Sequence, residues 1–237
     1  MKLTWLGQAG YRLTADNGMV IYIDPYLSDA LHEEKGETYV RQVPIRPADL
    51  AAHVDVLVLT HLHADHTDFP TIDQLVANNS TMAILAPLNV LNSFRARYPG
   101  VNLGYMLFDR GVEITLRGVR FISNYACHSD ERPIGVVIEG DGKVICHTGD
   151  TMYHRQLLVE LPRYADALLL PINGQGYNMN AVDAARLTRH LKPHAVYPMH
   201  WDLFHVYGCD VMDFVEQFEE SEREFIKIPE HYQEIIL

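Results

Sequence analysis

The chain has 237 residues, of which 48% are hydrophobic and 21% charged, and this balance excludes disorder, collagen and a coiled coil as descriptions of the whole protein. Its formal net charge of -12 repels polyphosphate backbones, and no basic cluster offsets that charge, which argues against nucleic acid as a partner. We therefore expect one soluble domain over residues 1–237, with a small molecule as its partner.

The N-terminal residues and the cysteines bear on the cellular compartment. Residues 1–6 run directly into strand-like sequence without the features of an export signal, and no apolar run approaches the roughly 18 to 20 residues that span a bilayer. Cys127, Cys146 and Cys209 lack a C-x-x-C spacing and are interpreted as small buried hydrophobes. These features predict a cytoplasmic protein with no membrane partner.

In the first half of the chain, predicted strands give way to alternating helices and strands. Turn residues 16–18 separate two of the strands, and a buried strand leads into a histidine-rich loop. We expect strands over Lys2–Leu6, Tyr11–Ala15, Met19–Ile23, Asp55–Thr60 and Met82–Leu85, a helical turn over Ala48–His53 and a helix over Thr71–Asn78. Residues 28–47 are polar and indicate no definite element.

The second half continues this organisation, with hairpins followed by helices between buried strands. We expect strands over Val112–Leu116, Val119–Ser123, Gly135–Glu139, Lys143–His147, Ala167–Pro171 and Ala195–Met199, and helices over Ala181–Leu191 and Val211–Glu220. No linker or low-complexity tract interrupts the pattern. The fold class indicated is α/β, with mixed sheets and helices outside.

The most specific motif is the H-x-H-x-D-H segment His61–His66, which directly follows the buried strand Asp55–Thr60. A loop that leaves a strand end can direct alternate side chains differently, so His61 and His63 can hold one cation while Asp65 and His66 face a second. The alternative interpretation is a solvated polar loop, or a helix cap formed by Asp65.

Three further candidate ligands follow other predicted strands. His128 follows the strand-like stretch 121–126, Asp150 follows Lys143–His147 after a glycine, and His200 follows Ala195–Met199. Alone, each is more simply interpreted as an ordinary hydrogen-bonded or turn residue. Together with the first motif they complete a set of five histidines and two aspartates, which is what two metal ions require.

This order of motifs resembles the metallo-β-lactamase superfamily over nearly the whole chain. The segments Trp5–Gly10, Ile23–Asp29 and Pro171–Gly174, with Asn178, are similar to the branch that contains L-ascorbate-6-phosphate lactonase. The resemblance implies an αββα sandwich of two mixed β-sheets flanked by helices, with the site at one sheet edge. It also implies that the first metal binds His61, His63 and His128, that the second binds Asp65, His66 and His200, and that Asp150 bridges them.

Two divalent ions, zinc or manganese, suit this donor set because imidazole favours zinc and carboxylates also admit manganese. A hydroxide between them is a nucleophile at neutral pH, with Asp65 and Asp150 as the catalytic carboxylates. Asp24 is interpreted either as a hydrogen-bond partner of a ligand imidazole or as a turn residue. For His147, His154 and His205 we expect supporting roles rather than ligation, with a proton relay between Asp202 and His205.

Candidate substrate residues lie in loops beyond the ligands: Asn173, Tyr177, Asn178, Trp201 and Asp202. The asparagines flank a glycine-rich stretch and offer amide donors, although a simple loop explains them equally well. Trp201 and Phe204 either wall the pocket or pack in the core.

The predicted activity is hydrolysis of a small lactone of a carbohydrate-derived acid. A phosphodiesterase is the first alternative, because the ligand set serves attack on phosphorus as well. Iron-dependent redox chemistry is the second; diiron flavoproteins of the superfamily carry a glutamate where this chain has His63, and they need a flavin domain. Relatives of the lactonase suggest a homo-oligomer.

Overall fold

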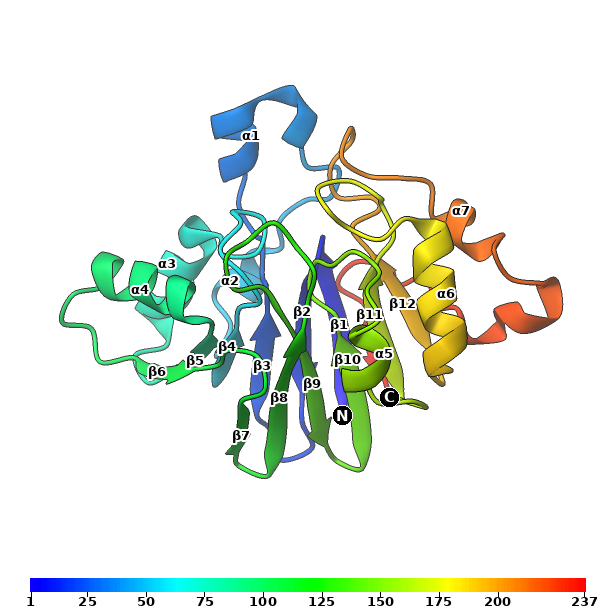
Figure 1. Cartoon of the computed structure of the whole chain (residues 1–237). Helices are drawn as coiled ribbons and strands as arrows, with labels where there is room; N and C mark the ends of the chain where they lie inside the picture. The colour runs from blue at the N-terminus through cyan, green and yellow to red at the C-terminus, as the bar shows by residue number, and fades with distance from the viewer.

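The computed structural model describes all residues from 1 to 237, and it places two β-sheets face to face with helices on their outer sides (Figure 1). The seven-stranded sheet has the order β13-β1-β2-β3-β4-β5-β6 and the six-stranded sheet the order β12-β11-β10-β9-β8-β7. This is the αββα sandwich that the sequence predicted.

The strands of the first sheet are β1 (Lys2–Gly7), β2 (Gly10–Thr14), β3 (Val20–Ile23), β4 (Val56–Val58), β5 (Ala83–Ala86), β6 (Gly104–Leu107) and β13 (Glu234–Ile236). Those of the second are β7 (Glu113–Leu116), β8 (Val119–Tyr125), β9 (Ile134–Gly140), β10 (Lys143–His147), β11 (Ala167–Pro171) and β12 (Val196–Met199). The helices are α1 (Ala30–Lys35), α2 (Pro47–Leu50), α3 (Phe69–Asn78), α4 (Leu88–Arg97), α5 (Leu157–Glu160), α6 (Ala181–Leu191) and α7 (Val211–Val215), with short 3₁₀ helices at Glu37–Tyr39 and Glu220–Phe225.

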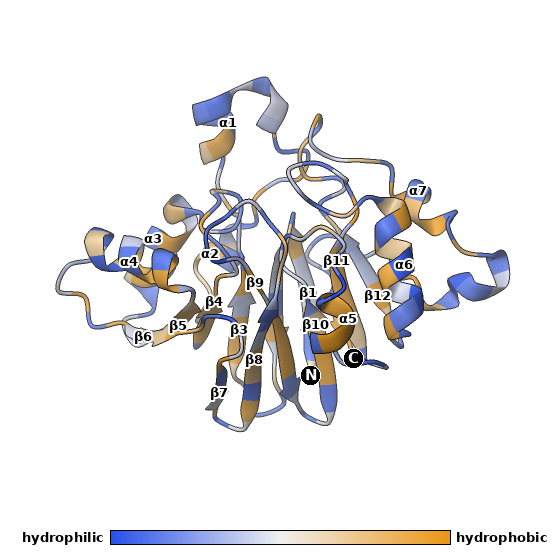
Figure 2. Ribbon diagram, in the orientation of Figure 1, coloured by the Kyte–Doolittle hydropathy of each residue, from blue (hydrophilic) through white to orange (hydrophobic).

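Three apolar layers hold the sandwich together. The largest fills the space between the sheets, where Trp5 and Ile23 of one sheet belong to the same buried cluster as Phe121 and Leu169 of the other. Separate clusters join α3 and α4 to the outside of the first sheet, and α6 and α7 to the outside of the second. Figure 2 shows the matching concentration of hydrophobic residues in the strands, whereas α1 stands apart and is largely hydrophilic.

The direction of the strands determines where the site lies. In the first sheet, β1 and β3 both pair antiparallel with β2, and β4 pairs parallel with β3, so β1, β3 and β4 run in the same direction. In the second sheet, β8 and β10 both pair antiparallel with β9, while β10 and β12 both pair parallel with β11, so β8, β10 and β12 also share one direction. The carboxyl ends of parallel strands meet at one edge of a sheet. Residues that directly follow these strands are therefore brought together.

The predicted elements are present with small shifts at their ends, except for one helix. The helix expected over Val211–Glu220 ends at Val215, since the chain then turns so that Phe218 packs against Phe214 and Phe225. The structure also contains elements that were not expected from the sequence: α1, α4, α5, β6, β13 and the two 3₁₀ helices. Cys146 is buried and the other two cysteines are half-buried, all as free thiols. No helix in the fold has the length and apolarity that a membrane crossing needs.

Candidate metal centre

The H-x-H-x-D-H segment forms a tight turn beyond the end of β4. His63 accepts hydrogen bonds at its carbonyl from the backbone amides of His66 and Thr67, and the Thr67 hydroxyl donates to the carbonyl of His61. The amide of Leu62 donates to the Asp130 carboxylate over 2.9 Å. These bonds fix the turn so that His61 and His66 are buried, while His63 and Asp65 border a cavity.

The remaining predicted ligands reach this turn from the second sheet. His128 follows β8, Asp150 follows β10 and His200 follows β12. Gly149 has a φ of +61°, and a Cβ there would lie 2.3 Å from the carbonyl oxygen of Ile134, so only glycine allows the turn that presents Asp150. His200 itself has a φ of +62°.

All seven residues converge, and Asp150 lies between two groups. The nitrogens of His61, His63 and His128 lie within 4.8 Å of one another, as do the ligand atoms of Asp65, His66 and His200. One oxygen of Asp150, Oδ1, lies 2.8 Å from His200 Nε2 and 3.3 Å from His66 Nε2. Its other oxygen, Oδ2, lies 3.8 Å from His128 Nε2. The carboxylate thus faces both groups at once.

Four atoms at the centre of this cluster that could bind a metal have no hydrogen-bond partner. They are Nε2 of His61, His66 and His200 and Oδ1 of Asp150, all buried. The 2.8 Å approach of His200 to Asp150 does not have hydrogen-bond geometry. A buried polar atom without a partner costs about 1–3 kcal/mol and is rare in native proteins. Imidazole nitrogens and carboxylate oxygens left free in this arrangement fit divalent cations, with zinc and manganese both compatible.

Asp24 supports the cluster from behind, at the end of β3. Its Oδ2 lies 2.7 Å from His66 Nδ1, and its two oxygens accept hydrogen bonds from the amide and the hydroxyl of Thr60. An acceptor at Nδ1 places the proton there and leaves Nε2 free for a metal. Of the two interpretations of Asp24, the structure favours the partner of a ligand imidazole.

Two amide side chains hold the acidic residues. The Gln8 amide, directly after β1, lies 2.9 Å from both Asp65 Oδ2 and His200 Nδ1. Asn178 donates a 2.9 Å hydrogen bond to Asp150 Oδ2. Sequence reasoning did not single out Gln8, although its place at the end of a strand parallel to β3 and β4 is the same signal that identified the ligands.

Without a cation, the cluster binds protons on one side and not on the other. Burial opposes protonation of His66, but the carboxylates of Asp150, Asp65 and Asp24 outweigh it and raise its pKa well above the usual value, so a cation bound there would displace a proton. Burial lowers the pKa of His61 well below its usual value, so its imidazole is neutral. Burial opposes ionisation of Asp65 and Asp150, but the neighbouring imidazoles of His66 and His200 outweigh it and hold the pKa of both carboxyls below the usual range. Both aspartates are therefore carboxylates at neutral pH.

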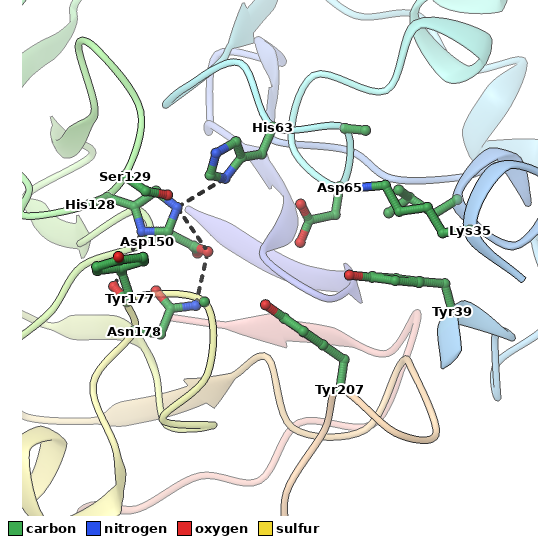
Figure 3. Close-up of a pocket in the computed structure, with 13 residues that line it drawn as sticks. Lys35, Tyr39, His63, Asp65, His128, Ser129, Asp150, Tyr177, Asn178 and Tyr207 are labelled. Carbon is green, nitrogen blue, oxygen red and sulfur yellow. Dashed lines mark hydrogen bonds and ion pairs between the residues drawn. The ribbon is translucent and has the colours of Figure 1, made fainter. Parts of the chain in front are cut away.

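A cavity of about 280 Å³ opens over the cluster, as Figure 3 shows. Of the five substrate candidates, Tyr177 and Asn178 line the cavity, whereas Asn173, Trp201 and Asp202 do not. The lining residues that sequence reasoning missed include Lys35, Tyr39 and Tyr207.

The three substrate candidates outside the cavity have other contacts. Trp201 packs against Trp5 with ring centroids 5.5 Å apart, and Asn173 donates to the carbonyl of Tyr207. Asp202 lies 3.5 Å from His231 rather than pairing with His205, so the predicted relay is wrong.

His147 and His154, for which supporting roles rather than ligation were expected, lie outside the cluster. His147 donates from Nε2 to the carbonyl of Ala9 and accepts at Nδ1 from the amide of Gly149, which ties the Asp150 turn to the first sheet. His154 accepts a hydrogen bond from the amide of Gln156 on the surface. The supporting role expected for His147 is thus present.

Comparison with known proteins identifies the family of the chain. Residues 20–201 match the beta-lactamase superfamily domain. A UPF0173 metal-dependent hydrolase of Archaeoglobus fulgidus is 30% identical over 229 residues, which cover 90% of this chain and 89% of the relative.

Two solved structures are similar in fold. Igni18, a metallo hydrolase of Ignicoccus hospitalis, has a TM-score of 0.75 at 23% identity, covering 99% of this chain and 97% of its own. The isothiocyanate hydrolase from Delia radicum gut bacteria has a TM-score of 0.80 at 20% identity, covering 100% of this chain and 99% of its own. The chain therefore belongs to the metallo-β-lactamase superfamily and, within it, to the UPF0173 family of metal-dependent hydrolases.

Proposed function

We propose that this hydrolase is binuclear and acts on a small cyclic ester, a lactone of a carbohydrate-derived acid. The observation that supports two metal ions is the pair of three-residue groups with Asp150 between them and four unpartnered donor atoms at the centre. One group alone would leave the other's buried nitrogens without partners, at a cost of about 1–3 kcal/mol each.

The ligands divide as the two groups do. His61, His63 and His128 would hold one ion, Asp65, His66 and His200 the other, and Asp150 both. Zinc or manganese bound there supplies Lewis acidity, which lowers the pKa of water toward about 7 and polarises the bond under attack. A serine or cysteine nucleophile is then unnecessary.

The carboxylates have distinct tasks in this proposal. Asp65 borders the cavity, is ionised, and is held by Gln8, so it can orient the attacking water and accept its proton. Asp150 is almost fully buried and fixed by Asn178, so it serves as the bridging ligand rather than as a proton carrier.

The size of the cavity supports a small substrate. Ligand pockets typically measure about 300–1,000 Å³, and this one, at about 280 Å³, is slightly smaller than that range. We assign substrate contacts to Tyr177, which is 60% exposed at the rim, and to Asn178.

The proposal is tested with protein loaded with zinc or manganese and assayed against a panel of sugar-acid lactones and against bis(p-nitrophenyl)phosphate. We expect lactone turnover with two metal ions per chain. Turnover of the phosphodiester with no activity on any lactone would establish the phosphodiesterase instead. One iron per chain with oxygen consumption would replace hydrolysis with redox chemistry.

A further inference from the structure

The cavity has two unlike sides. The inner side consists of the metal-facing residues. The opposite side, here called the outer wall, consists of Lys35, Tyr39 and Tyr207. In Figure 3 both tyrosine hydroxyls and the lysine ammonium point into the cavity toward the side of Asp65 and Asp150. None of the three belongs to the metal cluster.

The outer wall is a built structure that joins two segments far apart in the sequence. Tyr39 stacks on Tyr207 with ring centroids 5.5 Å apart, and the Lys35 ammonium lies 5.5 Å from the centroid of the Tyr39 ring. Phe204 packs edge-on against Tyr39 from behind. The amide of Gln42 donates to the carbonyl of Leu203 over 2.8 Å, which joins the segment after α1 to the loop after β12.

The loop 173–178 holds Tyr207 from its other side. Gln175 donates to the carbonyl of Gly208, next to Tyr207, over 3.2 Å. The Tyr207 hydroxyl rests against Gly176, where a Cβ would lie 2.5 Å from its oxygen. The position of this hydroxyl is therefore set by three segments of the chain.

The polar groups of the outer wall have no protein acceptor. Neither tyrosine hydroxyl makes a hydrogen bond within the protein, and Lys35 forms no ion pair, although α1 also carries Glu33 and Glu34. Lys35 is the only lysine or arginine that lines the cavity, in a chain whose net charge is -12. One ammonium and two hydroxyls thus face a shared space as unused hydrogen-bond donors.

We infer that the outer wall is a subsite for an anionic oxygen group, a carboxylate or a phosphate, carried by the substrate away from the bond that is hydrolysed. An ammonium and two hydroxyls match the acceptor oxygens of such a group, and charge-assisted hydrogen bonds are the stronger kind. The inference rests on the proposed function, since it assumes that the reacting bond lies at the opposite side. The inferred subsite narrows the substrate class from small esters in general to esters that also carry a carboxylate or a phosphate.

The test compares two lactones that differ by one carboxylate group: γ-butyrolactone and its γ-carboxylate. We expect wild-type protein to prefer the carboxylate form in kcat/KM. Lys35→Gln should reduce that preference roughly tenfold, mainly through KM, as expected for loss of a hydrogen bond to a charged group. Lys35→Arg should retain most of it, and Tyr39→Phe and Tyr207→Phe should each reduce it about threefold.

Lys2→Gln is the matched control, because it removes the same charge from an exposed residue paired with Glu234 outside the cavity. It should leave the preference unchanged. Equal preference in wild type and Lys35→Gln would overturn the subsite while leaving the hydrolase proposal intact.

A binding measurement keeps the subsite testable if neither lactone is hydrolysed. Calorimetric titration of zinc-loaded protein with glutarate and, separately, with inorganic phosphate distinguishes a carboxylate site from a phosphate site. Binding of one of them that weakens about tenfold in Lys35→Gln supports the subsite. Binding of neither, or binding that is the same in both proteins, rejects it whatever the reaction proves to be.

Discussion

The metal-facing side of the cavity and the outer wall enclose the same space but are built in different ways. The metal-facing residues are mostly buried and lie just after strands, so the two sheets hold them in place. The outer wall comes from α1, the 3₁₀ helix Glu37–Tyr39 and the loop after β12, and its members are exposed or half-buried. This contrast teaches that the groups suited to chemistry are placed by the sandwich, whereas those suited to choosing a substrate are placed by irregular segments.

Replacing Asp150 should have the largest effect on the metal-facing side. Asp150→Ala removes the carboxylate that faces both groups of ligands, so we expect metal content to fall and turnover to drop more than about 100-fold. Metal analysis and kinetics measure both, with circular dichroism to confirm that the sheets remain folded. Asp166→Ala, which removes a surface carboxylate paired with Lys143, is the control. Full activity in Asp150→Ala would contradict the bridging role.

Metal removal should weaken the fold itself, because the buried donor atoms then lack partners. At a metal concentration of about 100 times Kd the stabilisation is about 2.7 kcal/mol, which corresponds to a Tm shift on the order of 5–10 °C for a chain of this size. Calorimetry before and after treatment with a chelator measures it, and zinc should restore the loss. An unchanged Tm would show that the cluster is stable without cations.

Asp24→Asn tests the support behind the ligands. The neutral amide oxygen accepts the hydrogen bond from His66 Nδ1 more weakly than the carboxylate does, so metal affinity should fall about 10- to 100-fold while the protein still folds. Competition with a fluorescent chelator measures the affinity. Asp55→Asn removes a carboxylate that caps the amide of Val20 outside the site, and its metal affinity should equal that of wild type.

Gly176→Ala probes the junction between the outer wall and the loop 173–178. The added Cβ would meet the Tyr207 hydroxyl, so we expect kcat/KM to fall roughly tenfold through misplacement of that side chain, with metal content retained. Gly142→Ala has a similar positive φ of +72° but nothing within 4 Å, and it separates backbone strain from the clash. Equal kinetics in the two variants would show that the position of Tyr207 is unimportant.

Trp201→Phe should have the smallest effect on catalysis, because Trp201 packs against Trp5 and does not line the cavity. We expect KM to change less than about twofold, with a loss of about 1 kcal/mol in the free energy of unfolding. Kinetics and urea denaturation measure the two quantities. A large rise in KM would restore Trp201 as a pocket wall and weaken the contrast between the two sides.

The metal-facing side was predictable because its signals are local and repeated. The motif His61–His66 directly follows a strand, and the same strand-end position marked His128, Asp150 and His200. Gln8 occupies such a position too, but an uncharged amide is common enough that position alone did not distinguish it.

The outer wall was not predictable, because its members acquire their role only when distant segments meet. Tyr39 lies in a polar stretch with no clear periodicity, and Tyr207 lies in a loop whose path depends on packing against Tyr39 and Gly176. Trp201 and Asp202 were chosen as substrate residues for the opposite reason, their position in the sequence, but they do not line the cavity. They are adjacent to the ligand His200 in sequence, yet the left-handed backbone at His200 turns the chain, and both side chains contact other parts of the fold.

The left-handed backbone of several non-glycine residues at the site has a consequence for engineering. Gln8, Asp24 and His200 have φ values of +52°, +41° and +62°, and each such conformation costs roughly 1–2 kcal/mol that glycine would not incur. Glycine cannot replace them without loss of the side chains that make the centre. Glycine at these three positions would relieve the backbone but would also lose the stabilisation that bound metal supplies, so a screen for a more stable enzyme should keep metal present and require catalysis in the same round.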